Sequence, residues 1–174
     1  MTGSIRINFS FLEQEDRLCI EILREDLATR FLLTRRVTRR ALKGIADLLV
    51  RTSPVMARAP LAQRNEVIHF EHLCATQPDH AGEAATAAAA PDPAPSRATL
   101  VHTLSIETHP QHFAVSLIGD GDIAEAMAFG RAELHRLLAS LHQLAQIAEW
   151  GLDRDAAWLA DLPSAAADIP LTKC

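Results

Sequence analysis

Five cationic side chains gather in one short stretch of the chain and could bind an anion. They are Arg35, Arg36, Arg39, Arg40 and Lys43. Wound as a helix, they lie on one side of it, and guanidinium groups hold phosphate or carboxylate oxygens through two parallel hydrogen bonds. Free N–H groups at a helix N-terminus favour the same anions. We take these five residues as the candidate binding site; a solvated basic face without a ligand is the simpler interpretation.

His69, His72 and Cys74 carry side chains that metals bind and lie close together in the sequence. A structural zinc site uses four such ligands. The other donors that could complete the set are His80, His109 and His112. We interpret Cys74 instead as a small buried apolar residue and predict neither a metal nor a cofactor.

No recognisable catalytic signature is present, so we predict that the protein is not an enzyme. Nucleophilic catalysis needs a serine or cysteine with a base, and the sequence has no GxSxG elbow. The GDGD segment at 119–122 lacks the lysine of a P-loop and the ligand order of an EF-hand, so a turn between strands explains it better. We expect His135 and His142 to be exposed or capping groups on a late helix.

The cationic residues belong to an expected amphipathic helix at 35–50. Its apolar stripe, which should face a core, consists of Val37, Ala41, Leu42, Ile45, Leu48 and Leu49. Pro54 and Pro60 then break the chain, and residues 61–74 can form a second helix. That helix has a less regular apolar side, for which Leu61, Ile68, Phe70, Leu73 and Cys74 are available.

Three strands are expected before the basic helix. Apolar residues alternate with polar ones in 4–12 and again in 17–24, which is typical of half-buried strands paired as a hairpin. Residues 29–33 can form a third strand. The side chains expected to face inward are Ile5, Ile7, Phe9, Phe11, Leu18, Ile20 and Ile22.

The same order recurs about 95 residues later, which indicates an internal duplication. Residues 100–106, 113–118 and 125–129 are expected strands, and 130–150 an expected helix in which Arg131 and Arg136 correspond to Arg35 and Arg40. Leu100, His102, Leu104 and Ile106 are expected to face inward. The predicted fold class is α+β: two βββα repeats packed as a pseudo-twofold domain, with an extra helix and a disordered linker between them.

Composition sets the boundaries of these units. Residues 1–76 hold the first repeat and extra helix, 77–98 an Ala/Pro-rich flexible linker, 99–152 the second repeat, and 153–174 a short helix and tail. Residues 1–77 carry 12 basic and 9 acidic side chains, whereas 78–174 carry 5 and 13. Any anion site is therefore expected in the first half.

No signal peptide or membrane span is recognisable, and the three cysteines are scattered, so we expect a cytoplasmic protein.

Two kinds of binding function fit these features. The first is a non-catalytic binding or scaffolding module that presents strands and helices to a protein partner or to a second copy in a dimer. The second is single-stranded nucleic-acid binding through Arg35 to Lys43. In topology, repeated strands followed by a helix resemble the DNA-binding repeats of the PC4, Whirly and PUR-type proteins, which implies a single-stranded ligand. Phe9, Phe11 and Phe31 are the only plausible stacking platforms near the arginines.

Overall fold

The structure is a computed structural model that describes residues 5–24, 27–77, 98–122, 124–152 and 158. Most of the linker predicted at 77–98 and most of the predicted 153–174 unit lie outside these residues. The helices are α1 (Arg35–Thr52), α2 (Arg64–Thr76) and α3 (Arg131–Ile147). The strands are β1 (Ile5–Leu12), β2 (Arg17–Arg24), β3 (Leu27–Leu33), β4 (Ala98–Thr108), β5 (Phe113–Gly119) and β6 (Ala124–Phe129). The predicted α+β class is confirmed, and no described helix is long and apolar enough to cross a membrane.

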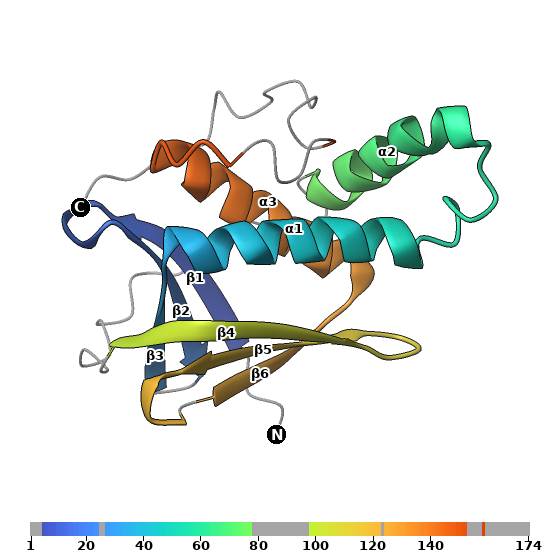
Figure 1. Cartoon of the computed structure of the whole chain (residues 1–174). Helices are drawn as coiled ribbons and strands as arrows, with labels where there is room; N and C mark the ends of the chain where they lie inside the picture. The colour runs from blue at the N-terminus through green and yellow to red at the C-terminus, as the bar shows by residue number, and fades with distance from the viewer. Residues whose placement is uncertain (1–4, 25–26, 78–97, 123, 153–157, 159–174) are drawn as a thin grey trace.

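The six strands form one sheet in the order β1-β2-β3-β4-β5-β6. Within each half the strands are antiparallel neighbours, as in the hairpin that pairs Ile5 with Arg24. The two halves meet through a short parallel pairing of β3 with β4, from Arg30 opposite Ala98 to Leu32 opposite Leu100. Figure 1 shows β1 to β3 running steeply across the direction of β4 to β6, so the sheet is sharply bent at this junction.

The strands of the first half are where their period-two pattern predicts them. Leu18, Ile20 and Ile22 of β2 are buried in the core, as expected. Their neighbours on the edge strand β1 are less covered: Phe9 is half-buried and Ile5 is 48% exposed. The expected inward face is therefore completely buried on β2 and only partly buried on β1.

One register shift overturns part of the prediction for β4. Val101 lies opposite Gly119 and Thr103 opposite Ile118, so His102 is an extra residue in a β-bulge. A bulge reverses the alternation of faces. Consequently Val101 is buried while His102 and Leu100 are exposed, contrary to expectation, and only after the bulge do Leu104 and Ile106 face inward, half-buried.

Gly119 is required opposite this bulge. A Cβ atom at this position would lie 2.2 Å from Thr99 Cγ2 and 2.9 Å from the Leu100 carbonyl oxygen. Because both distances are shorter than real Cβ contacts, only glycine lets β5 approach β4 so closely. The following segment, Asp120–Asp122, forms the predicted turn into β6, with Gly121 at a φ of 73°.

Helix α1 begins at an N-cap that the sequence supplies. The Thr34 Oγ1 atom accepts a hydrogen bond from the Val37 amide at 3.2 Å, which satisfies one of the free N–H groups of the first turn. The stripe expected on this helix is confirmed for its central residues, which are buried: Ala41, Leu42, Ile45 and Leu49. Val37 and Leu48 are only half-buried, whereas Thr38 and Ala46 are buried although the stripe did not include them.

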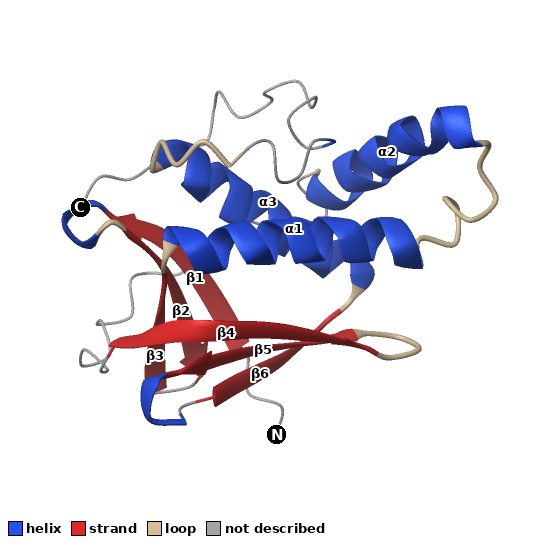
Figure 2. Ribbon diagram, viewed as in Figure 1, coloured by secondary structure: helices blue, strands red, loops and turns tan. Residues whose placement is uncertain are grey.

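The helices cross-connect the two halves of the sheet. Helix α1 follows the first three strands but contacts β4 as well as β2 and β3, and α3 follows the last three but contacts β1 as well as β6. The two helices contact each other along one side of the bent sheet, where Figure 2 shows them together. Each half therefore supplies a helix that covers the first strand of the other half.

Helix α2 lies on α3 and buries less of its surface than predicted. Ile68 is fully buried, but Leu61 before the helix is 80% exposed and Phe70 is 69% exposed. Cys74, expected to be buried, is exposed. The reason is that α2 contacts α3 along one side only, where Ile68, His72 and Ala75 are buried.

Leu42 of α1 and Leu138 of α3 are both fully buried. We predict that Leu42→Ala and Leu138→Ala each lower the free energy of unfolding by about 2–5 kcal/mol, because each substitution leaves a cavity in the core. Urea denaturation would measure the loss. Leu61→Ala is the matched control, since this leucine is 80% exposed, and should change stability by less than about 0.5 kcal/mol. Unchanged stability of either core variant would contradict this packing.

Candidate functional site

The predicted cationic residues form an exposed basic face along the first half of α1. Arg35, Arg36, Arg39, Arg40 and Lys43 are all exposed. Lys43 Nζ forms an ion pair with Asp47 Oδ2 at 3.1 Å. Within the described part of the chain, the four arginines have no hydrogen bond or ion pair. The fold therefore leaves four guanidinium groups together on one surface with their donors directed to solvent.

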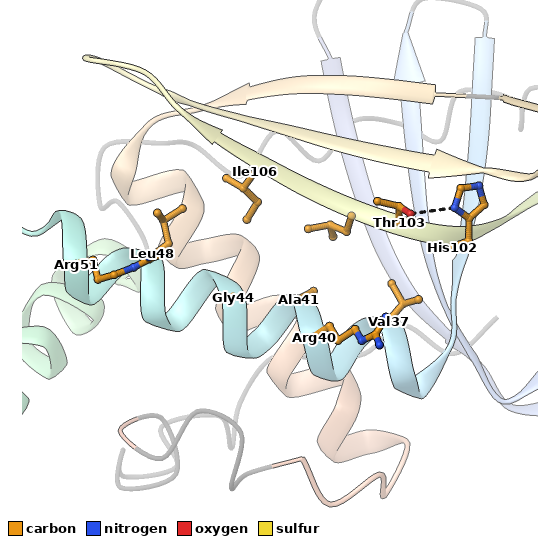
Figure 3. A pocket seen from close by; sticks show the side chains of 10 residues that line it. Val37, Arg40, Ala41, Gly44, Leu48, Arg51, His102, Thr103 and Ile106 are labelled. Atoms are coloured by element: carbon orange, nitrogen blue, oxygen red, sulfur yellow. Dashed lines mark hydrogen bonds between the residues drawn. The ribbon is translucent and has the colours of Figure 1, made fainter.

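A groove of about 340 Å³ lies next to this basic face, between α1 and β4 (Figure 3). Its apolar lining comes from both elements and consists of Val37, Ala41, Leu48, Leu104 and Ile106. Its polar lining consists of Arg40, Arg51, His102 and Thr103. Of the five predicted site residues, only Arg40 belongs to both the basic face and the groove.

Gly44 keeps the middle of the groove open. A Cβ atom placed on this residue meets nothing within 4 Å, so a side chain here would project into free space. A glycine inside a helix costs about 1 kcal/mol relative to alanine. The sequence signal for the groove is therefore a glycine inside the basic helix, which hydrophobic periodicity does not reveal.

The β-bulge in β4 places His102 at the groove. The His102 Nε2 atom lies 3.2 Å from the Gly119 carbonyl oxygen, and Nδ1 lies 3.0 Å from Thr103 Oγ1. Since a carbonyl oxygen can only accept, Nε2 carries a proton and donates it to Gly119, while the Thr103 hydroxyl forms a hydrogen bond with Nδ1. These two contacts fix the orientation of the imidazole ring on the β4 side.

The charged side chains that line the groove are positive. Arg40 and Arg51 contribute positive charge from α1, and no acidic side chain lines the groove among the described residues. Arg51 Nε donates to the Asp47 carbonyl oxygen at 3.4 Å, a bond that orients the guanidinium group without neutralising it. A ligand that combined apolar groups with a negative charge would match both parts of this lining.

The aromatic residues expected near the arginines do not form a stacking platform. Phe31 is completely buried, and Phe9 and Phe11 are half-buried and pack on the core. Phe11 also meets the ring of Trp150 edge-on at a centroid distance of 6.2 Å. Nucleobases therefore have none of these rings available as an open face.

A second group of polar side chains, which the sequence did not reveal, lies buried where α2 meets α3. His135 is completely buried and His72 is 4% exposed, and their Nδ1 atoms are 3.1 Å apart. Trp158 packs edge-on against His72 at a centroid distance of 5.4 Å. His135 was expected to be exposed or capping; it is buried because the side of α3 that carries it is covered by α2. His142 is half-buried.

Arg131 fixes this group to the end of α1. Its guanidinium donates to the Leu49 carbonyl oxygen at 2.6 Å and to Thr52 Oγ1 at 2.8 Å, and it pairs with Glu71 of α2. Glu71 also accepts a hydrogen bond from Ser53 Oγ at 3.0 Å. The expected duplication aligned Arg131 with Arg35, yet Arg131 joins three helices whereas Arg35 faces solvent.

The buried groups have displaced pKa values. Burial and the neighbouring charge of His135 lower the pKa of His72 to about 4. Burial also lowers the pKa of His135, and the Glu71 carboxylate opposes this only in part. For Glu71, burial raises the pKa, but the hydrogen bond and charge of Arg131 outweigh it, so that the carboxyl group titrates below its ordinary range.

The described residues weighed as metal ligands are not assembled into a site, and His80 lies outside the described residues. His69 lies against Trp158 and bonds its carbonyl oxygen, whereas Cys74 is exposed. No three His, Cys, Asp or Glu side chains in the described part of the chain are grouped so that they could hold a metal ion.

Comparison with known proteins gave no matching family model, no matching curated protein and no matching solved structure.

We predict that changing Arg35, Arg36, Arg39 and Arg40 together to glutamine alters the free energy of unfolding by less than about 1 kcal/mol. These side chains have no described partner, and removing cations from the first turns relieves their repulsion with the positive end of the helix dipole. Thermal melting would measure this change in stability. Arg131→Gln is the control and should cost about 1–3 kcal/mol, because it leaves Glu71 and two α1 acceptors unpaired. A quadruple variant as unstable as the control would show that the basic face is structural.

Proposed function

We propose that the protein is a non-catalytic binding module and that the basic face and groove of α1 receive an acidic segment of a protein partner. The observation that carries the proposal is the composition of the groove: apolar side chains from α1 and β4, Arg40 and Arg51 on the helix side, and no acidic residue in the described lining. Apolar side chains of the partner would fill the groove, and its carboxylates would pair with the arginines.

Single-stranded nucleic acid is the second candidate ligand. The exposed guanidinium groups of Arg35, Arg36 and Arg39 favour it, since arginine binds phosphate as well as carboxylate. Nonspecific single-strand sites combine such cations with aromatic rings on which bases stack. Because Phe31 is buried and Phe9 and Phe11 pack on the core, the protein segment is the better match.

We also propose that the chain arose by internal duplication of a βββα unit and that the two units are related by a pseudo-twofold axis. The support is the recurrence of the element order and the reciprocal contacts of α1 with β4 and α3 with β1. A twofold rotation that exchanged the units would exchange these two contacts. Such a domain could also self-associate as a dimer.

A cytoplasmic location remains our proposal, supported by the exposed free thiol of Cys74.

The proposed ligand predicts a specific effect of filling the groove. We expect Gly44→Leu to weaken binding of a labelled peptide that alternates Asp or Glu with Leu by tenfold or more, because the new side chain occupies the groove. Gly44→Ala is the matched control: it adds one methyl group in open space and should leave binding within about threefold while stabilising the helix by up to about 1 kcal/mol. Fluorescence anisotropy with purified protein would measure both affinities.

The same measurement separates the two ligands. A single-stranded oligonucleotide bound by the basic face should lose affinity with added salt, with a log–log slope of about −0.7 per phosphate contact. Its binding should fall on changing Arg35, Arg36 and Arg39 to glutamine and be insensitive to Gly44→Leu. Acidic-peptide binding that Gly44→Leu leaves unchanged would exclude the groove as the site, and oligonucleotide binding with the expected slope would support the second candidate instead.

A further inference from the structure

The buried pair of His72 and His135 is not used by the basic face or the groove. The two imidazoles lie on different helices, 63 residues apart in sequence, and their Nδ1 atoms are 3.1 Å apart. Both side chains are more than nine-tenths buried. Two buried nitrogens at this distance need one proton between them, because two lone pairs or two N–H groups facing each other would repel.

The surroundings decide which histidine carries that proton. His135 Nε2 is buried, has no hydrogen-bond partner within the described residues, and lies 3.6 Å from Glu71 Oε1. A proton on this Nε2 faces the carboxylate favourably, whereas a lone pair there would be repelled. Neutral His135 therefore has its proton on Nε2 and a lone pair on Nδ1. His72 must then donate from its own Nδ1 to His135.

We propose that the His72–His135 pair is a proton-operated latch: it holds α2 on α3 when both imidazoles are neutral, and uptake of one further proton buries a positive charge between the helices and releases α2. In the neutral pair one Nδ1 donates and the other accepts. A further proton enters at His135 Nδ1, where it sets two donors face to face, or at His72 Nε2, where the hydrogen bond survives. Either way a net positive charge is buried between the helices.

The Glu71 carboxylate favours the extra proton on His135 in part, but burial and the other charges around the pair disfavour it. On α2, His69 lies against Trp158, and Glu71 is already paired with Arg131. On α3, Arg131 adds positive charge beside His135, Arg136 donates to the Ala75 carbonyl oxygen of α2, and His142 opposes a charge on His72. From α1, the described contacts with Arg131 are neutral, the Leu49 carbonyl and Thr52 hydroxyl groups. Trp158 adds an apolar ring.

The lowered pKa values of both histidines set the direction of the effect. His72 has a pKa of about 4 in the folded chain against an ordinary 6.5, so between these values the open state binds more protons than the closed one. The closed state is therefore fully favoured above about pH 6.5 and loses its advantage as the pH falls toward 4. As the pH falls, the equilibrium constant for the release of α2 rises by up to tenfold per pH unit for each proton that the open state takes up.

Hydrogen exchange of the full chain tests the latch, with the amides of α2 as the readout and those of α1 and β5 as the internal reference. Between pH 7 and pH 5 the protection of α2 should fall tenfold or more relative to a His72→Asn/His135→Asn variant measured at the same pH. Asparagine keeps a neutral amide near the Nδ1 position but cannot take up a proton in this range. Comparison at equal pH cancels the chemical dependence of exchange on pH.

His112→Asn is the matched control, since His112 is an exposed histidine in the turn between β4 and β5, and its α2 protection should follow that of the unaltered protein. Equal pH dependence in the unaltered protein and the double variant would overturn the proposal. So would an equal loss of protection in α1 and β5, which would mean global unfolding. If the double variant does not fold, nitrogen NMR of the unaltered protein decides: protonation of both histidines at or above pH 6.5 would overturn the latch.

Discussion

Among the described residues, the strand pairing that joins the two halves of the sheet is one short parallel stretch, from Arg30 opposite Ala98 to Leu32 opposite Leu100. So few ladder hydrogen bonds cannot fix the angle between two three-stranded units, and neither unit alone can cover its apolar face. The helices supply the missing constraint, because α1 contacts β4 of the second half and α3 contacts β1 of the first. Burial of Leu42 and Leu138 between these layers makes the two halves one core.

In this arrangement the two ends of α1 have different surroundings. At its beginning, α1 is capped by Thr34 and exposes arginines for which no partner is found among the described residues. At its end, the Leu49 carbonyl and Thr52 hydroxyl groups are occupied by Arg131, which also holds Glu71 of α2. The first half of the helix can therefore change its surface charge without disturbing the core, whereas the second half is part of the junction that holds α2.

The groove is a consequence of how α1 lies on β4. Val37 and Leu48 stop short of full burial, and Gly44 between them leaves the space open. A helix optimised only for stability would have alanine at that position, which contributes about 1 kcal/mol more than glycine. The buried histidines at the α2–α3 contact also lower the stability of the fold. A pair of leucines would avoid a polar contact in the core, so both features lower stability in places where they leave a groove or a titratable contact.

The sequence by itself determined the elements that have a local period. Alternation predicted β1, β2 and β5, the apolar stripe predicted α1, and helical spacing placed Arg35 to Lys43 on one exposed face. Tertiary structure decided what depends on residues far apart in the chain. His135 is buried because α2 covers it, Arg131 is structural because it meets Glu71 60 residues away, and the bulge at His102 depends on pairing with Gly119. Periodicity describes which side of an element is apolar, but only the packed partner decides whether a charged or polar group on that side is exposed, paired or buried.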